Sequence, residues 1–196
     1  MTEHSPDSQQ QASRPSRWPL LAGAVWPLLL IAGVWWFLSA GEDIEARDAQ
    51  GWTALMVAAE AGHYPQVTAL LKRGAEIDAR DDCGWTPMMR AAAGGHLEVM
   101  ECLLDHGANL HQQEKTGQNA LMAAVLNNRE NTTQALILRG AEVNVQEQSM
   151  GLTPLMWAAR NGNAQITEWL LEAGADPDVR NHWGQTAEQM RTQPAS

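Results

Sequence analysis

Cysteine is scarce in this sequence, which contains only Cys83 and Cys102. A small secreted domain that depends on a disulfide framework needs several cysteine pairs, so that class of protein is excluded. Cys102 lies in an apolar helical run where a small hydrophobic side chain packs well, whereas Cys83 falls in a predicted loop. A helix interior and a loop rarely offer the geometry of a disulfide bond, and we therefore expect two free thiols.

The motifs of catalysis and metal binding are also missing. The sequence has no nucleophile elbow, no phosphate-binding glycine loop, no pair of catalytic carboxylates and no zinc-ligand spacing. His63 and His96 recur 33 residues apart, and a predicted turn separates His106 from His111, which argues against a metal site formed by that second pair. We therefore expect a protein that is not an enzyme, with no catalytic residue, no cofactor and no metal site.

Positive charge is in short supply as well. The chain has 13 Lys and Arg against 23 Asp and Glu, and its net charge is −10. The first 17 residues carry two acidic and two basic side chains, so nearly all of the acidic excess lies after residue 40. An acidic surface repels phosphate backbones, so we expect no nucleic acid as a partner. A protein partner with a basic face fits better.

Charged residues are absent from Trp18 to Ala40, a run of 23 residues. A helix of that length spans about 35 Å, which is enough to cross the core of a bilayer. Trp18 near one end and Trp35 and Trp36 near the other are placed as interfacial aromatic residues usually are. The run predicts a transmembrane signal-anchor helix over 18–40, preceded by a disordered tail over 1–17.

Two other interpretations of this segment stay open. A cleaved signal peptide is suggested by Arg14 and Arg17 before the segment and by the small residue Ala40 at its end, but signal peptides have shorter apolar regions. A buried core helix is disfavoured because the segment is apolar all round. The basic residues precede the segment and acidic residues follow it, so the N-terminus is expected in the cytoplasm and the rest of the chain across the membrane. The excess of Arg over Lys suggests a bacterial source, and hence a periplasmic location, membrane-anchored or soluble after cleavage.

Glycine recurs with a fixed period. One series consists of Gly51, Gly84, Gly117, Gly151 and Gly184, at spacings of 33, 33, 34 and 33 residues. A second series with the same spacings consists of Gly41, Gly74, Gly107, Gly140 and Gly174. The two series together predict a repeat array whose one extra residue lies between Gly140 and Gly151.

Each repeat has the pattern of a helix pair. Helix N-caps are predicted at Thr53, Thr86, Asn119, Thr153 and Thr186. Turns are predicted at Gly62-His63, Gly95-His96, Asn128-Arg129 and Gly162-Asn163. The second helices carry the apolar pairs Leu70-Leu71, Leu103-Leu104, Ile137-Leu138 and Leu170-Leu171. Each second helix runs into a glycine of the second series, which suits a left-handed C-cap. The pattern predicts an all-α array.

These units resemble ankyrin repeats over residues 41 to about 190. The features shared with that family are a Thr-Pro-Leu helix start, a Gly-His turn and a second helix that ends in Gly-Ala-Asp, as in Thr153-Pro154-Leu155, Gly95-His96 and Gly174-Ala175-Asp176. The resemblance implies an all-α helix-turn-helix solenoid with finger β-turns, following the transmembrane helix. The expected repeat domain spans 41–196, with a half unit at 41–47, full units at about 48–80, 81–113, 114–147 and 148–180, and a capping half unit at 181–196.

A column of methionines departs from the family pattern, in which His commonly follows Thr-Pro-Leu. The corresponding residues here are Met56, Met89, Met122, Met156 and Gln189. One interpretation is a thioether ladder for Cu(I) or an oxidation sensor, working with Cys83 or Cys102. The favoured interpretation is a flexible apolar filler at a packed position between repeats.

The resemblance also implies where a partner binds, namely at the finger tips and at exposed positions of the first helices. The candidate partner-binding residues are Gln50, Trp52, Glu60, Asp82, Trp85, Lys115, Gln118, Met150, Leu152, Arg160, His182 and Trp183. Trp52 and Trp85 share one repeat position in consecutive units and are expected about 10 Å apart, as hot-spot residues or as rings packed over their own fingers. Trp157 and Trp169 are interpreted as core residues.

The function we expect is that of a monomeric scaffold or adaptor. It would hold a partner protein near the membrane through the concave face of the ankyrin-type array. Two alternatives are kept: a redox or copper-handling periplasmic protein that uses the methionine column, and an inhibitor that binds in the cleft of an enzyme.

Overall fold

The computed structural model describes residues 43–192 as a row of helix pairs. The helices are α2 (Ala54–Glu60), α3 (Tyr64–Lys72), α4 (Pro87–Gly94), α5 (Leu97–Asp105), α6 (Ala120–Leu126), α7 (Glu130–Leu138), α8 (Pro154–Asn161), α9 (Ala164–Glu172) and α10 (Ala187–Arg191). No strand occurs within this range, in agreement with the predicted all-α repeats. The transmembrane helix predicted over 18–40 lies outside the described residues.

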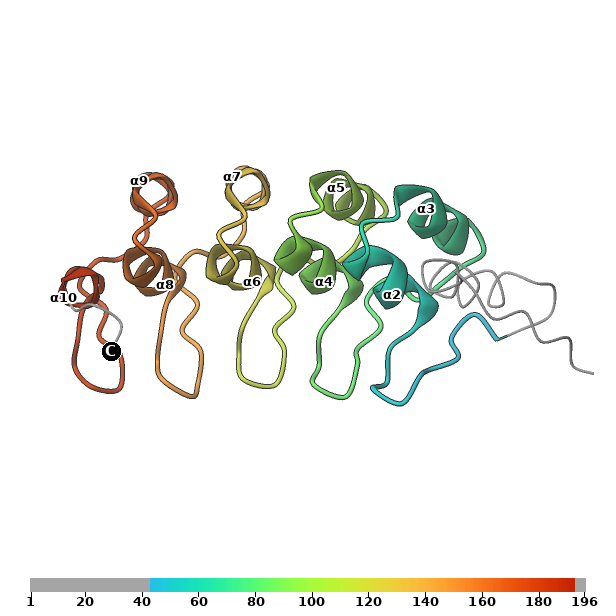
Figure 1. The fold of residues 1–196 in the computed structure, drawn as a ribbon, viewed down its shortest axis with the longest axis horizontal. Coiled ribbons are helices and arrows are strands. Elements are labelled where there is room, and N and C mark those ends of the chain that lie inside the picture. Colours follow the sequence, from blue (N-terminus) through green and yellow to red (C-terminus); the bar gives the residue numbers. More distant parts are fainter. Residues whose placement is uncertain (1–42, 193–196) are drawn as a thin grey trace, which may run out of the picture.

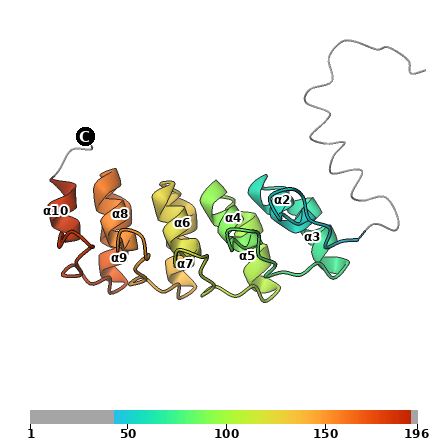
Figure 2. The same ribbon diagram turned by 90° about the horizontal axis from the view of Figure 1, so that it is seen from below.

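The helices form two layers (Figure 1). The first helices of the pairs, α2, α4, α6, α8 and α10, make the inner layer, and the loops between consecutive pairs project from it as fingers. The second helices, α3, α5, α7 and α9, make the outer layer on the side away from the fingers. Figure 2 shows the same pairs in line when seen from below. Among the helices of residues 43–192, none has the length and apolar character needed to cross a bilayer.

The predicted caps begin the inner helices. The side chains of Thr53, Thr86, Asn119 and Thr153 each accept a hydrogen bond from the backbone N–H three residues later. In α10, the side chain of Gln189 accepts from the N–H of Thr186 at 2.9 Å. This bond explains why the last unit has glutamine in the methionine column, because Gln189 caps the helix to which it belongs.

The turns and C-caps need left-handed backbone, and the glycine pattern supplies it. Gly95 in the turn between α4 and α5 has φ of 80°, and Gly107 after α5 has φ of 92°. The third unit has Asn128 at the turn position, with φ of 54°. Asparagine tolerates this conformation better than most residues with a side chain, so the predicted Asn128-Arg129 turn forms without glycine.

The core lies between the two layers and continues from unit to unit. The methionines Met56, Met89, Met122 and Met156 are at most 1% exposed, as the apolar-filler interpretation predicts. Met89 and Met156 belong to a core cluster that is largely Leu, Met, Val and Ala. Trp157 and Trp169 are partly buried against this core.

One predicted register in the outer layer is wrong. The residue that aligns with the buried Leu70, Leu103 and Leu170 is Leu136, which is 0% exposed. The predicted pair Ile137-Leu138 is therefore shifted by one residue, and Leu138 is 80% exposed. The cap glycine sets the register, because the leucine four residues before it faces the core in every unit.

Candidate partner-binding surface

Each finger is shaped by one polar side chain at its start. The residues at this position are Asp48, Asp81, Glu114, Glu147 and Asn181. In the second finger, Oδ1 of Asp81 accepts hydrogen bonds from the N–H groups of Cys83, at 2.9 Å, and Trp85, at 2.8 Å. The side chain thereby satisfies the donors of the tight turn that no backbone acceptor reaches. A polar residue recurs at this position of every finger, but the sequence alone does not show that its side chain holds the turn.

Glu147 holds the one finger that is a residue longer than the others. Its side chain is buried, at 1% exposure, and the extra residue lies between it and Gly151. Burial acts to raise the pKa of the Glu147 carboxyl, but hydrogen bonds donated by the N–H of Leu152, the hydroxyl and N–H of Ser149 and the N–H of Met150 outweigh burial, so the pKa is lowered. The carboxylate is therefore a charged structural centre of this finger.

Backbone hydrogen bonds join neighbouring fingers into one ledge. The N–H of Lys115 donates to the carbonyl of Cys83 at 3.1 Å, and the N–H of His182 donates to the carbonyl of Met150 at 3.0 Å. Bonds of the same kind connect the first finger to the second and the third to the fourth. The exposed side chains at the finger tips are therefore held at fixed spacings along the array.

A stack of three side chains occupies the surface between the first two units. The guanidinium carbon of Arg90, on α4, lies 4.0 Å from the ring centroid of Trp52 and 4.7 Å from that of Trp85. The two ring centroids therefore lie no more than about 9 Å apart, and Arg90 contacts both rings. A guanidinium over both indole faces is a favourable cation–π arrangement.

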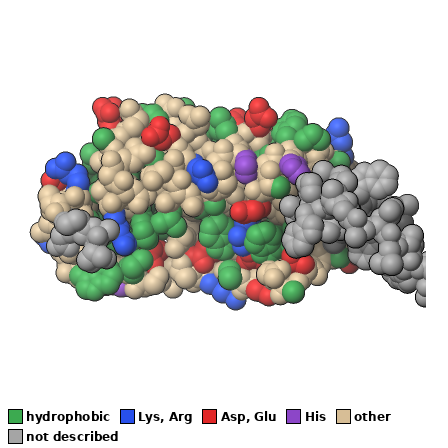
Figure 3. Space-filling model, viewed as in Figure 1, with side chains coloured by type: hydrophobic (Ala, Val, Ile, Leu, Met, Phe, Trp, Pro, Cys, Tyr) green, Lys and Arg blue, Asp and Glu red, His purple; other side chains and the backbone are tan. Residues whose placement is uncertain are grey.

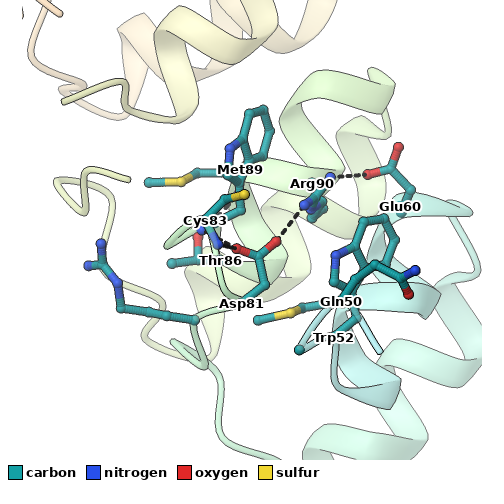
Figure 4. A network of polar contacts seen from close by, with 12 residues as sticks. Gln50, Trp52, Glu60, Asp81, Cys83, Thr86, Met89 and Arg90 are labelled. Carbon is teal, nitrogen blue, oxygen red and sulfur yellow. Dashed lines mark hydrogen bonds and ion pairs between the residues drawn. The ribbon is translucent and has the colours of Figure 1, made fainter. Parts of the chain in front are cut away.

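Two carboxylates hold Arg90 in this position (Figure 4). Nη2 of Arg90 donates to Oδ2 of Asp81 at 2.5 Å, and its Nη1 lies 3.8 Å from Oε2 of Glu60. The side chain of Asp81 is 1% exposed and that of Arg90 is 16% exposed, so this ion pair is largely removed from water. Asp81 therefore connects the finger turn to the stack, because one oxygen holds the turn and the other holds Arg90.

The stack leaves apolar surface facing solvent. Trp52 and Trp85 are both half-buried. Figure 3 shows hydrophobic surface on both sides of a basic group over the region of α2 and α4. The exposed carboxylates Glu60 and Asp82 belong to the same two units. This part of the array therefore combines fixed aromatic rings with negative charge.

Sequence reasoning missed Arg90. The equivalent positions of the other units hold Val57, Ala123 and Trp157, so no repeated pattern marked it. The signal in the sequence is Arg90 itself, a cation on the first helix of the second unit. The first and second units, which meet there, both have tryptophan directly after the first-series glycine.

The remaining candidate residues are spread over the ledge and inner helices. Those exposed to solvent are Gln50, Lys115, Arg160, His182 and Trp183, while Gln118 and Met150 are half-buried. Trp183, on the last finger, is 63% exposed. The guanidinium of Arg160 lies 5.2 Å from the ring centroid of Trp157, which gives α8 a smaller stack of its own.

Leu152 does not belong to this surface. Its side chain is 0% exposed and is part of the hydrophobic core, so the expectation that it is available to a partner was wrong. Leu152 occupies the repeat position of Trp52 and Trp85, but an aliphatic side chain without a cation beside it is more stable turned inward.

The two cysteines differ in their surroundings. Cys83 is exposed, Cys102 is buried, and both thiols are free. Burial, with a smaller contribution from Asp105, raises the pKa of the Cys102 thiol, which disfavours the reactive thiolate. Within residues 43–192, no group of three or more His, Cys, Asp or Glu side chains is placed to hold a metal ion.

Comparison with known families identifies the repeat. A family model described as "Ankyrin repeats (3 copies)" matches residues 30–114, 66–147 and 106–181. The first match begins inside the hydrophobic segment and covers its last residues, 30–40. No curated protein matches the chain.

Proposed function

Because the chain belongs to the ankyrin repeat family, we propose that it is a scaffold or adaptor that binds another protein along its fingers and inner helices. Ankyrin repeats generally mediate protein–protein interaction and are typically non-enzymatic. The repeats of this chain supply the corresponding surface as a ledge of linked fingers beside the inner helices.

The observation that carries the proposal is the stack of Trp52, Arg90 and Trp85. Large aromatic side chains contribute strongly to binding when their orientation is fixed before the partner arrives, because less conformational entropy is then lost. Arg90 fixes both rings, and Asp81 in turn fixes Arg90. The exposed carboxylate of Asp82 favours a partner that presents Lys or Arg next to an apolar residue.

The location we propose follows from residues 18–40. Their lack of charge, the arginines that precede them and the acidic residues that follow them support a membrane anchor with the repeats outside the cytoplasm. The partner would then be held close to the membrane, since the repeats begin directly after the segment. The family match from residue 30 supports a different role for 30–40, as part of a first repeat.

Reporter fusions test the proposed orientation of the chain in the membrane, and a mass measurement tests whether residues 18–40 are cleaved. A reporter active only outside the cytoplasm, fused after Ser196, is expected to be active, and activity of a cytoplasmic reporter alone would reverse the orientation. The mass of the purified chain separates an anchor from a cleaved signal peptide, because cleavage removes about 40 residues.

Affinity purification followed by mass spectrometry tests the binding surface. The wild-type chain is expected to capture one main partner, and the double variant Trp52→Ala/Trp85→Ala is expected to lose it while keeping its helical circular dichroism. Tyr64→Ala is the matched control, because Tyr64 is an aromatic residue of the outer layer that is 44% exposed. Retention of the partner by the double variant would refute the assignment of this surface.

A further inference from the structure

Helices α7 and α9 lie in the outer layer, on the side of the array away from the fingers (Figure 1). Their side chains form a largely apolar surface around a hollow of about 290 Å³. The residues that line the hollow are Gln134, Ile137, Leu138, Trp169, Glu172 and Ala173. We call these six residues the α7–α9 surface. None of them takes part in the binding surface described above.

The other full units show which residues the scaffold accepts at the position of Leu138. This residue stands two positions before the cap glycine of its unit, where the other full units have Lys72, Asp105 and Glu172. All four side chains are exposed, and Leu138 is 80% exposed. The scaffold therefore forms with a charged residue at this position, and packing within the chain does not explain the leucine.

Trp169 is unusual in the same way. It stands five positions before its cap glycine, where the other units have the small residues Ala69, Cys102 and Ala135. Single exposed apolar residues are common on protein surfaces and need no explanation. Here two apolar departures from the repeat pattern lie on neighbouring helices and line one hollow, which is the arrangement of an interaction site.

We propose that the α7–α9 surface is a second docking site, which takes a partner segment carrying an apolar side chain flanked by Lys or Arg. The hollow is at the small end of the range for ligand sites, so it suits one or two large side chains better than a free small molecule. The protruding Leu138 would pack beside the inserted side chain, with Trp169 forming the wall of the hollow.

Negative charge beside the hollow favours Lys or Arg next to the apolar side chain of the partner segment. Glu172 lines the hollow and forms no ion pair within residues 43–192, and Glu168 is exposed on the same helix. The nearby cation Arg139 is engaged by Glu101 at 2.7 Å and by Asp105 at 3.1 Å. A basic segment meets favourable charge here, whereas a second copy of this chain would bring the same carboxylates and a net charge of −10.

The α7–α9 surface rests on the proposed adaptor function and extends it to a second partner. It can do so because it faces away from the fingers. Two proteins bound to the two faces would not compete for space, so the array would join them. The two surfaces also fail independently: loss of the α7–α9 surface leaves the stack of Trp52, Arg90 and Trp85 intact.

Binding of a defined peptide to the full chain tests the proposal. The probe is a synthetic amphipathic helical peptide of Leu and Lys, titrated by calorimetry at about 0.15 M salt to screen distant charges. Leu138→Asp and Trp169→Ala, each copying a residue that another unit has at that position, are expected to weaken binding at least about tenfold, a loss of about 1.4 kcal/mol. Tyr64→Ala, which changes an exposed aromatic residue of α3 outside both surfaces, is expected to bind the peptide as the wild type does.

Three outcomes would overturn the proposal. The first is unchanged affinity in both Leu138→Asp and Trp169→Ala. The second is equal binding of a matched peptide of Leu and Glu, which would remove the role of Glu172. The third is a wild-type dimer in light scattering that Leu138→Asp converts to a monomer, because that result assigns the surface to a second copy of the chain.

Discussion

The second unit of the array, residues 81–113, and the third, residues 114–147, share one backbone plan but place polar and apolar side chains differently. In the second unit the buried carboxylate of Asp81 is paired with Arg90, and the outer helix α5 buries Val99 and Met100. In the third unit the outer helix α7 buries Thr132 and Thr133, whose hydroxyls have no hydrogen-bond partner, and exposes Leu138.

This difference shows which positions the scaffold leaves free for other uses. A unit in a solenoid is supported by its neighbours, so α7 can keep unfavourable side chains that a lone helix pair would not tolerate. Buried hydroxyls without partners and an exposed leucine both cost stability or solubility. Such departures from local rules mark positions that folding alone does not explain, and on α7 we assign the exposed Leu138 to binding.

The largest expected effect comes from breaking the buried pair of the second unit. Asp81→Ala leaves Arg90 without its buried partner and removes the acceptor of the finger turn. The free energy of unfolding should therefore fall by about 3–5 kcal/mol. Urea denaturation of the variant measures this loss. Asp82→Ala is the control, because the adjacent carboxylate is exposed and its removal should change stability by less than about 0.5 kcal/mol. Equal losses in the two variants would contradict the structure of this pair.

A smaller loss is expected at the end of the same unit. Gly107 has φ of 92°, and a Cβ atom there would meet no other atom within 4 Å, so only backbone strain opposes a side chain. Gly107→Val should therefore lower the free energy of unfolding by about 1–2 kcal/mol. The midpoint of thermal unfolding reports the change, and an unaltered midpoint would show that this glycine is not a required cap.

The third unit should gain stability from a substitution that makes it more like the others. Thr133→Val replaces a buried hydroxyl that has no partner, and we expect a gain of about 1 kcal/mol in the free energy of unfolding. Thr167→Val is the matched control at the same repeat position of the fourth unit, where the hydroxyl donates to the carbonyl of Asn163 at 2.8 Å. That variant should lose stability or stay unchanged, and a gain of the same size in both would remove the distinction between α7 and α9.

The smallest effect concerns pH and the longer finger. The pKa of Glu147 is lowered from its ordinary value of 4.5, so the folded state favours the charged carboxylate. Its contribution to stability is present above pH 4.5 and is lost as the pH falls through the lowered pKa. Glu147→Gln should flatten the dependence of the melting temperature on pH below about 4.5. Glu142→Gln, which changes an exposed carboxylate, should leave that dependence as it is in the wild type.

Features that depend on neighbouring residues were predictable from the sequence. Threonine and asparagine caps, left-handed glycines and the position of the helices follow from local rules, and the repeat period shows each rule several times. The position of Leu138 was misjudged because the apolar run Leu136 to Leu138 allows two registers, and only the cap geometry decides between them. Leu152 was misjudged because it was assigned by analogy with the tryptophans at its repeat position.

The stack of Trp52, Arg90 and Trp85 was predicted only in part. The tryptophans share a repeat position, which the sequence shows. Arg90 contacts Trp85 of its own unit and Trp52 of the preceding unit, and the other full units have no arginine at its position. The α7–α9 surface was not found either, because Trp169 was taken as a core residue and Leu138 as half of a buried pair. Arg90, Leu138 and Trp169 all differ from the residues at the same position of the other units, so the repeat pattern alone does not predict their roles.

The most direct test of the central claim is the affinity of the purified main partner for the wild-type chain and for Trp52→Ala/Trp85→Ala, with Tyr64→Ala as the control. Removal of a single hot-spot residue costs at least about 2 kcal/mol, or about thirtyfold in affinity, so the double variant should bind at least about thirtyfold more weakly while Tyr64→Ala binds as the wild type does. Affinities within twofold of each other for all three proteins would show that the stack does not bind the partner.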